Sequence, residues 1–362
     1  MQENKRLIDI EWAQLQGLSL REKSAYFNRD GRPMHVLTAQ QFDRPMLDAL
    51  CGLATAIRHI AKNKQGMRFL SDLLDHRRGM LYFSQPSSRT FLSFYAACEN
   101  LGLKVAEVRD TSTSSEMKGE SPEDTVRTFS SYFDLIIMRS PKQGFAERMA
   151  WLLSNTDRPV PIINAGSGKD QHPTQALLDI YTLQRSFERR GGIEGKTVVF
   201  CGDLLRGRTV RSLSYLLTNY PGVRQIFAAP RELQVGEDIL QQLDEADIEY
   251  HTTEDFRSVM ADADAIYMTR LQDEWDDKPG QSASFDKQCY RICGADLGRL
   301  KRSAIIMHPL PRRQEIDMEV DSDPRAMYWR QVRNGMWTRA ALIASMFGLE
   351  PTVREYYVRN IV

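Results

Sequence analysis

Hydroxyl and guanidinium groups gather where a predicted strand gives way to a predicted helix. The apolar run 79–83 is typical of a short strand, and helical spacing follows over 88–101. Between them lie Ser87, Ser88, Arg89 and Thr90. A helix N-terminus attracts anions, and arginine can bind a phosphate through two parallel hydrogen bonds. The pattern predicts an anion site, although an ordinary helix capped by Ser87 or Ser88, with a surface arginine, fits it equally well.

Two other predicted strands of the same series also end in polar groups. Arg139 follows the strand 134–138, and His172 and Gln175 open the helix 172–188, which follows the strand 160–163. A single arginine or histidine in such a place is most often a surface charge or a structural residue. Ligands of open α/β sheets bind beyond the carboxyl ends of the strands. Three such groups after three strands therefore indicate one binding site.

The second half of the chain repeats this arrangement on the predicted strands 197–201, 225–229, 248–251, 264–268 and 304–307. Arg208 and Thr209 follow the first of these strands, and Arg270 and Gln272 follow the fourth. Two planar guanidinium groups suit a ligand with two carboxylates. A dinucleotide site is disfavoured, because the glycines do not have the GxGxxG spacing and two arginines would crowd the pyrophosphate.

The order of these elements predicts an α/β protein of two domains, each with a mostly parallel sheet flanked by helices. The chain of 362 residues is longer than one core usually spans. We expect an N-terminal extension with one helix over 1–40, a first domain over 41–188 and a second over 189–337. A helix is predicted at 44–64. The segment 338–347 also has helical character, and we expect a C-terminal helix over 338–362 that packs back on the first domain.

Composition excludes several classes of function. Lysine plus arginine equals aspartate plus glutamate at 48 each, so no overall field favours nucleic acid or an anionic membrane. No apolar run is long enough to span a bilayer, and the first residues lack the apolar core of a signal peptide. The five cysteines are scattered without a CxxC pair, so we expect free thiols, no metal site and a reducing cytoplasm.

The motifs of the first half carry a family resemblance. Pro86-Ser87-Ser88-Arg89-Thr90 with Ser93-Phe94, then Met138-Arg139, then His172-Pro173-Thr174-Gln175 resemble the aspartate/ornithine carbamoyltransferase family, and the ordered match runs from about 45 to 347. The resemblance implies that the domain 41–188 binds carbamoyl phosphate, with an active site in the interdomain cleft. The phosphate would be bound by Ser87, Ser88, Arg89 and Thr90. The carbamoyl end would be held by Arg139, His172 and Gln175.

The motifs of the second half resemble the aspartate branch of that family. They are Gly202–Val210, Arg270-Leu271-Gln272 and His308-Pro309-Leu310-Pro311-Arg312. The resemblance implies that 189–337 binds aspartate through Arg208, Thr209, Arg270 and Gln272, while Pro309 and Leu310 contact carbamoyl phosphate. An ornithine enzyme is expected to carry a cysteine after the histidine of this last motif, and none is present.

The implied reaction is attack of the α-amino group of L-aspartate on the carbamoyl carbon, in de novo pyrimidine (UMP) biosynthesis and without a cofactor. Two alternatives stay open. One is a carbamoyltransferase with another amino-acid acceptor, such as ornithine. The other is a weakly active homologue that serves as a scaffold.

A long polar loop at 111–120 matches a loop of the family that enters the active site of a neighbouring subunit. Ser114 and Lys118 stand at the matching positions, so the resemblance implies a homotrimer with shared sites, in which Lys118 contacts both substrates. The implied catalytic residues are Arg89, Thr90, Lys118, Arg139 and His172. A regulatory chain or a dihydroorotase is a possible partner.

Four positions depart from the family pattern. Ser88 stands where a threonine is frequent, which keeps a hydroxyl group. Phe91 stands where an arginine is frequent, and Gln85 and Trp275 stand where relatives can carry a charged pair that links the domains. Domain closure must therefore rely on other contacts, while the implied chemistry is unaffected.

Overall fold

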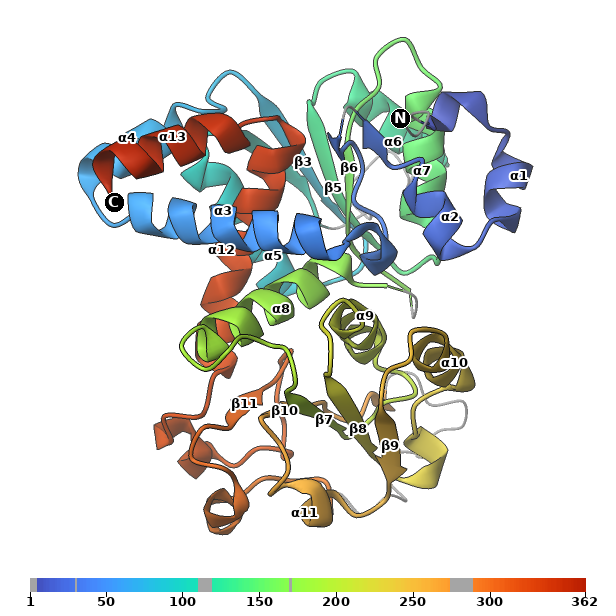
Figure 1. The fold of residues 1–362 in the computed structure, drawn as a ribbon. Helices are drawn as coiled ribbons and strands as arrows, with labels where there is room; N and C mark the ends of the chain where they lie inside the picture. The colour runs from blue at the N-terminus through green and yellow to red at the C-terminus, as the bar shows by residue number, and fades with distance from the viewer. Residues whose placement is uncertain (1–4, 30, 110–118, 169–170, 274–288) are drawn as a thin grey trace. The chain divides into compact units, whose positions relative to one another are not determined.

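The computed structural model describes residues 5–29, 31–109, 119–168, 171–273 and 289–362. The chain divides into two compact units: unit 1 is Met1–Thr174 with Gly335–Val362, and unit 2 is Gln175–Asn334. Each unit has its own parallel sheet flanked by helices, as the sequence predicts (Figure 1). The division falls inside helix α8 (Pro173–Phe187), which the sequence assigned to the first domain.

The sheet of unit 1 has the strand order β4-β3-β5-β6, with all pairs parallel. Its strands are β3 (Arg78–Phe83), β4 (Lys104–Val108), β5 (Leu135–Ser140) and β6 (Ile162–Ser167). Its flanking helices include α5 (Ser88–Asn100), α6 (Pro122–Ser130) and α7 (Phe145–Ser154). Strand β6 begins later than the sequence predicts because Pro161 has no N–H for the ladder; its carbonyl still accepts from the Ile136 N–H.

The sheet of unit 2 has the order β11-β10-β7-β8-β9 and is also parallel. Its strands are β7 (Thr197–Cys201), β8 (Arg224–Ala228), β9 (Tyr250–Thr253), β10 (Ala265–Met268) and β11 (Ile305–Met307). Its helices include α9 (Arg208–Leu217), α10 (Glu237–Glu245) and α11 (Phe256–Val259). β7 and β10 are buried central strands, which explains why both read as apolar runs.

The N-terminal 40 residues hold more structure than the single helix predicted. Two short helices, α1 (Trp12–Gly17) and α2 (Leu20–Ser24), precede a hairpin of β1 (Asn28–Arg29) and β2 (Arg32–Pro33). Leu7, Leu15 and Phe27 are buried in the core of unit 1 beside β5 and α7. Each helix is too short to show a clear apolar period, so tertiary contacts rather than local pattern define this segment.

Helix α7 holds that segment in place. The Lys23 ammonium lies 2.9 Å from a carboxylate oxygen of Glu147, and both side chains are largely shielded from solvent. The Trp151 indole N–H donates to the Ile10 carbonyl at 2.8 Å. The segment is therefore an integral layer of unit 1.

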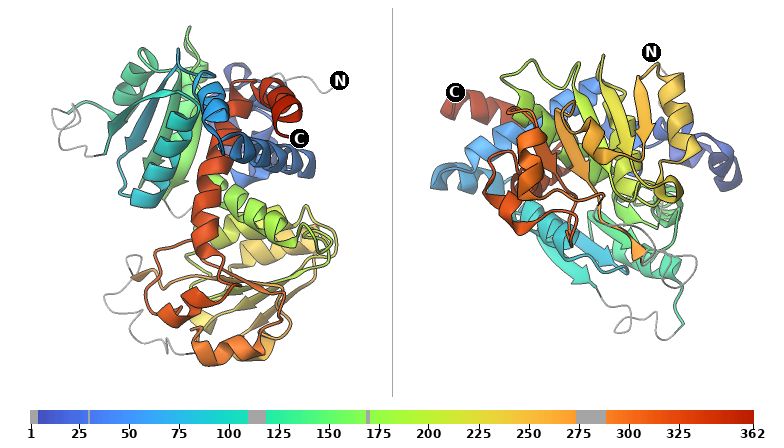
Figure 2. Two further views of the ribbon diagram at one scale, coloured as in Figure 1. Left: turned by 90° about the vertical axis from the view of Figure 1, so that its left-hand side faces the viewer. Right: turned by 90° about the horizontal axis from the view of Figure 1, so that it is seen from below.

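The C-terminal helices are longer and more numerous than predicted. Helix α12 (Tyr328–Met346) begins ten residues before the predicted 338, and the predicted C-terminal helix 338–362 is divided, since α13 (Glu350–Asn360) is a separate helix. Helix α13 packs on α3 (Arg44–Ile60), beside α4 (Lys64–Ser71) (Figures 1 and 2). The helix predicted at 44–64 corresponds to α3, which ends four residues earlier. Phe69 stacks on Tyr356 with ring centroids 3.8 Å apart. Within the described part of the chain, no helix is both long and apolar enough to cross a membrane.

Candidate active site

The predicted phosphate loop leads into the first turn of α5. Ser87 takes the N-cap position with an extended backbone, as the sequence allows, although within the described residues its hydroxyl makes no capping hydrogen bond. Thr90 is 8% exposed, whereas Ser88 and Arg89 are exposed. The first turn therefore keeps N–H groups that a bound anion could accept from.

The backbone of Arg139 fixes this loop to the neighbouring strand. Its carbonyl accepts from the Ser84 hydroxyl at 3.2 Å and from the Gln85 N–H at 3.3 Å. Since Arg139 is the penultimate residue of β5 and Ser84 follows β3, the two strand ends are tied together. One residue thus anchors the anion loop through its main chain and offers a guanidinium through its side chain.

Arg139 and His172 approach each other around Gly166. The register between β5 and β6 shifts between Met138 and Ser140, an irregularity that redirects the side chain of Arg139. Gly166 has a φ of +115°, and a Cβ built on it would lie 2.6 Å from Arg139 Nη1 and 3.5 Å from His172 Cδ2. Both side chains are buried, at 8% and 5% exposure. Only a glycine at this position leaves room for both side chains.

Polar side chains hold the loop after β6. Asn164 accepts from the Gly166 N–H at 2.9 Å and donates to the Leu37 carbonyl at 3.0 Å. Gln171 accepts from the Ala39 N–H at 3.3 Å. The N-terminal 40 residues therefore help to support the loop that leads to His172.

In unit 2, Asp203 joins the two loops that carry the predicted aspartate-binding residues. It is fully buried, and its carboxylate accepts from the Arg206 N–H at 3.1 Å and from the Gln272 N–H at 3.0 Å. Burial raises the pKa of this carboxyl, and these hydrogen bonds, with the charges of Arg206 and Arg270, oppose that rise. The loop after β7 and the loop after β10 are thus held by one acid.

The arginines of these loops leave the ends of adjacent strands. Arg208 and Thr209 begin α9 behind Gly207, and Arg270 follows β10, with its guanidinium donating to the Leu271 carbonyl at 2.9 Å. Gly202 has a φ of +113°, and a Cβ there would lie 2.2 Å from the Thr269 carbonyl oxygen. A side chain at that position would force the ends of β7 and β10 apart.

The loop after β11 has a defined backbone. The Leu310 N–H donates to His308 Nδ1 at 2.7 Å, so His308 must donate from Nε2 to Glu315 at 2.7 Å. Burial opposes the charge of Glu315, yet its hydrogen bond with His308 contributes to a pKa below the usual value. Leu310 has a φ of +55°, an uncommon conformation for leucine that is typical of functional loops. Pro309 and Leu310 therefore present fixed carbonyl groups.

Some predicted residues lie outside the described part of the chain: Ser114, Lys118 and Trp275. Phe91 is described and 4% exposed; it packs edge-on against Phe83, and the Arg109 guanidinium lies 4.3 Å from its ring centre. In place of the frequent arginine, this position carries an aromatic ring that contacts the guanidinium of Arg109, the residue directly after β4.

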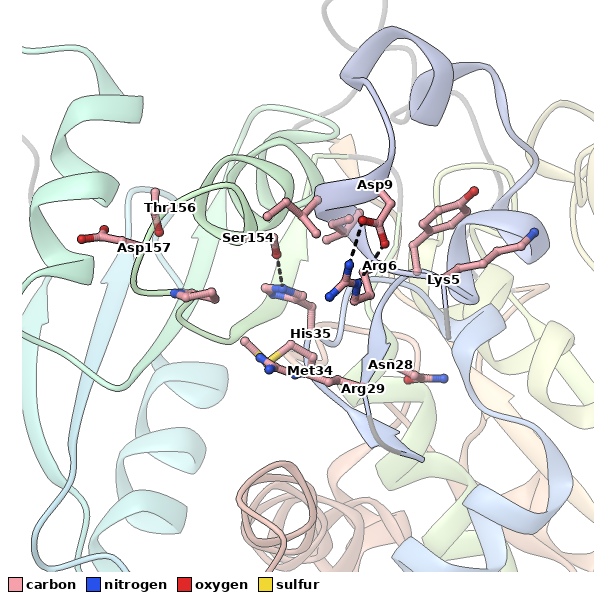
Figure 3. Close-up of a pocket in the computed structure, with 14 residues that line it drawn as sticks. Lys5, Arg6, Asp9, Asn28, Arg29, Met34, His35, Ser154, Thr156 and Asp157 are labelled. Atoms are coloured by element: carbon pink, nitrogen blue, oxygen red, sulfur yellow. Dashed lines mark hydrogen bonds and ion pairs between the residues drawn. The ribbon is translucent and has the colours of Figure 1, made fainter. Parts of the chain in front are cut away.

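A cavity of about 860 Å³ lies elsewhere in unit 1, between the N-terminal segment and the end of α7 (Figure 3). None of the predicted site residues lines it. His35 lies at its wall, with Nε2 3.0 Å from the Ser154 hydroxyl and Nδ1 accepting from the Ile162 N–H. Burial lowers the pKa of His35 to about 3. No group of three or more His, Cys, Asp and Glu residues suited to a metal ion occurs in the described ranges.

Two buried residues missed by sequence reasoning border the predicted site in unit 2. Asp179 accepts a hydrogen bond from Gln175, and Tyr267 donates to Asp179. Both lie within apolar runs, where a polar residue gives no signal of its partners.

The fold defines a two-unit α/β protein with arginines at or next to the strand ends of each sheet. The chain belongs to the aspartate/ornithine carbamoyltransferase family: the carbamoyl-phosphate-binding domain model matches residues 34–185, and the Asp/Orn-binding domain model matches 194–346.

Several relatives of this chain are named aspartate carbamoyltransferase or aspartate transcarbamoylase. The chain is 38% identical over 312 residues to aspartate carbamoyltransferase 1, chloroplastic, of Pisum sativum, covering 85% of this chain and 77% of the relative. It is 41% identical over 269 residues to the aspartate carbamoyltransferase catalytic subunit of Clostridium novyi, covering 74% and 85%. Aspartate transcarbamoylase of Trypanosoma cruzi in complex with carbamoyl phosphate and aspartate matches with a TM-score of 0.74 at 37% identity, covering 86% of this chain and 95% of that one.

Proposed function

We propose that the chain transfers the carbamoyl group of carbamoyl phosphate to the α-amino group of L-aspartate, giving N-carbamoyl-L-aspartate and phosphate, in pyrimidine biosynthesis. The observation that carries this proposal is the pairing of Arg139 with His172 around Gly166, at the strand ends next to the start of α5. The relatives named aspartate carbamoyltransferase support it.

In the proposed donor site, the phosphate accepts from the first turn of α5 and from Ser87, Ser88, Arg89 and Thr90. Arg139 and His172 donate to the carbamoyl oxygen, on which negative charge grows as the amine attacks. The departing phosphate can take the proton of the amine, so no base from the protein is required. Preorganised donors of this kind each supply about 2.7–4 kcal/mol of transition-state stabilisation.

The arginines of unit 2 favour aspartate over ornithine. A dicarboxylate needs two cationic partners, and Arg208 and Arg270 follow strands whose loops Asp203 joins. The side chain of ornithine ends in a cationic amine, and loops that carry two cationic arginines are unsuited to bind a second positive charge. Thr209, Gln272 and Lys118 belong to the same proposed aspartate-binding set.

The proposal extends to a homotrimer, in which Ser114 and Lys118 serve a neighbouring site, and to a reducing compartment, the cytoplasm. The exposed apolar side chains of Leu92 and Tyr95 support the trimer, since they lie one turn apart on α5 and are 60% and 39% exposed. All five cysteines are free, and burial raises the pKa of Cys51 and Cys98, which keeps both thiols protonated. Light scattering of the purified chain tests the trimer: a mass of one chain, about 42 kDa, contradicts it.

The activity is tested by initial rates with carbamoyl phosphate and each amino acid in turn. Product formation with L-aspartate, and a kcat/KM for L-ornithine lower by at least about 10³-fold, is expected from the mismatch of charge. Equal rates would favour a broader acceptor range, and no product from either would support the scaffold alternative. Arg139→Ala, which removes a proposed donor, should lower kcat by about 10²–10³-fold.

A further inference from the structure

Gln175 is the residue of the proposed donor site whose chemistry depends most on its orientation. A glutamine amide has an oxygen that accepts and a nitrogen that donates, and the two ends are close in shape. The carbamoyl group of the donor ends in an NH₂, which can only donate. Gln175 helps to bind that group only when its oxygen, rather than its nitrogen, faces the substrate.

Asp179 determines which end faces inward. It lies one helical turn after Gln175 on α8 and is fully buried. Its carboxylate accepts from Gln175 Nε2 at 2.9 Å and from Gln331 Nε2 at 2.7 Å. An ionised carboxylate has no hydrogen to donate, so the amide nitrogen must face it and the amide oxygen must face away.

Tyr267 reinforces the same orientation. Its hydroxyl donates to the other carboxylate oxygen of Asp179 at 2.7 Å, and it also lies in hydrogen-bonding reach of Gln175 and Thr209. Burial, followed by the charge of Asp179, raises the pKa of Tyr267 well above its usual value, so the hydroxyl keeps its proton. Tyr267 reaches this buried cluster from β10, so its hydroxyl lies close to both Gln175 and Thr209.

The network continues to the loop after β11. Gln331, whose amide nitrogen donates to Asp179, accepts from the His308 N–H at 2.9 Å with its oxygen. His308 in turn accepts from the Leu310 N–H. One carboxylate therefore orients both Gln175 and the loop that bears Pro309 and Leu310, and backbone carbonyls are also acceptors for an NH₂ group.

We propose that Asp179 is a positioning residue that makes the donor site selective for a carbamoyl group, by turning the oxygen of Gln175 toward the NH₂ of the substrate. The inference rests on the proposed function and adds the origin of its selectivity between a carbamoyl and an acetyl group. These two groups differ only in NH₂ against CH₃, so size alone separates them poorly.

The test uses two stable phosphonates, phosphonoacetamide and phosphonoacetone, which differ only in that NH₂ and CH₃. Their dissociation constants are measured by calorimetry on the full chain, and the ratio of the two reports selectivity without requiring turnover. The variants are Tyr267→Phe and the double variant that combines Asp179→Asn with Tyr267→Phe. Tyr267→Phe keeps the carboxylate and should keep the ratio within about 3-fold of wild type.

In the double variant, the side chain at position 179 is a carboxamide, and the Tyr267 hydroxyl that contacted it is gone. The NH₂ of this carboxamide is expected to turn toward Gln175. The amide of Gln175 then turns around, so that its nitrogen rather than its oxygen faces the substrate. The preference for phosphonoacetamide should fall by about 10–10²-fold, the cost of facing two donors in a buried site. Thr182→Val is the matched control. It removes another buried hydroxyl from helix α8, and that hydroxyl accepts a hydrogen bond from Asn334 at 3.0 Å. It should lower thermal stability and leave the ratio unchanged.

A folded double variant that keeps the wild-type ratio overturns the assignment of Asp179 while leaving the carbamoyltransfer reaction intact. Wild-type protein that binds neither phosphonate and forms no carbamoyl aspartate overturns the proposed function instead. A fall in the ratio for Thr182→Val as large as that for the double variant would show that the effect is merely structural, and would also overturn the assignment.

Discussion

Replacing Gly166 with alanine tests how closely the donor site is packed. The new methyl group would lie 2.6 Å from Arg139 Nη1, whereas an ordinary contact is about 3.5 Å, so the guanidinium must move by about 1 Å. A misplacement of that size at a reacting group costs about 10²-fold in rate. The φ of +115° is also strained for alanine, by about 1–3 kcal/mol of folding free energy.

Steady-state kinetics and thermal unfolding separate the two effects. We expect Gly166→Ala to lower kcat by about 10²-fold, with a smaller change in the KM for aspartate, whose proposed ligands lie in unit 2. The control is Gly31→Ala, in the β1–β2 turn of the same unit, where φ is +75° and no atom lies within 4 Å of the added carbon. It should lose a comparable amount of stability and keep its kcat. A Gly166→Ala enzyme with wild-type kcat would refute the close approach of Arg139 and His172.

Three further perturbations probe other parts of the chain. Arg270→Ala should raise the KM for aspartate by about 10²-fold, which corresponds to the loss of two charged hydrogen bonds. The affinity for phosphonoacetamide should stay nearly unaltered. Equal losses for both ligands would contradict the proposal that Arg270 binds the acceptor and not the donor. His35 is neutral when folded, with a pKa of about 3, and protonates near pH 6.5 when unfolded, so stability should fall by about 2 kcal/mol from pH 7 to pH 5. Denaturant unfolding of His35→Gln should lack that part of the acid slope, and an identical slope would contradict the burial of the neutral ring. Trp151→Phe removes the hydrogen bond to the Ile10 carbonyl and should cost about 1 kcal/mol and speed proteolysis within the first 40 residues; unchanged cleavage there would show that α7 does not hold this segment.

The sequence predicts the strand ends of this protein well because the central strands are continuous apolar runs. Arg139 and Arg270 stand directly after such runs, so the sheet edge on which each lies could be predicted before any coordinates. That α13 is a helix separate from α12 could not be predicted in this way. Most of its residues are polar, and Val353 is its one buried residue, so its packing on α3 leaves little periodic signal.

The grouping around the candidate site depends on features that a linear pattern does not contain. Gly166 matters through the sign of its φ and through two side chains that approach it from other segments. Asp179 and Tyr267 are 88 positions apart in the chain and meet only because α8 packs near β10 within unit 2. Sequence reasoning gave neither of these two residues a role.

The central proposal is that Arg139 binds the carbamoyl donor and Arg270 binds the acceptor, and N-(phosphonacetyl)-L-aspartate carries both halves in a single molecule. Calorimetric titration of wild type, Arg139→Ala and Arg270→Ala with this compound tests the claim most directly. We predict tight binding by wild type and a loss of at least about 10²-fold in each variant, because each removes charged hydrogen bonds to a different half of the ligand. Wild-type affinity in either folded variant would contradict the account.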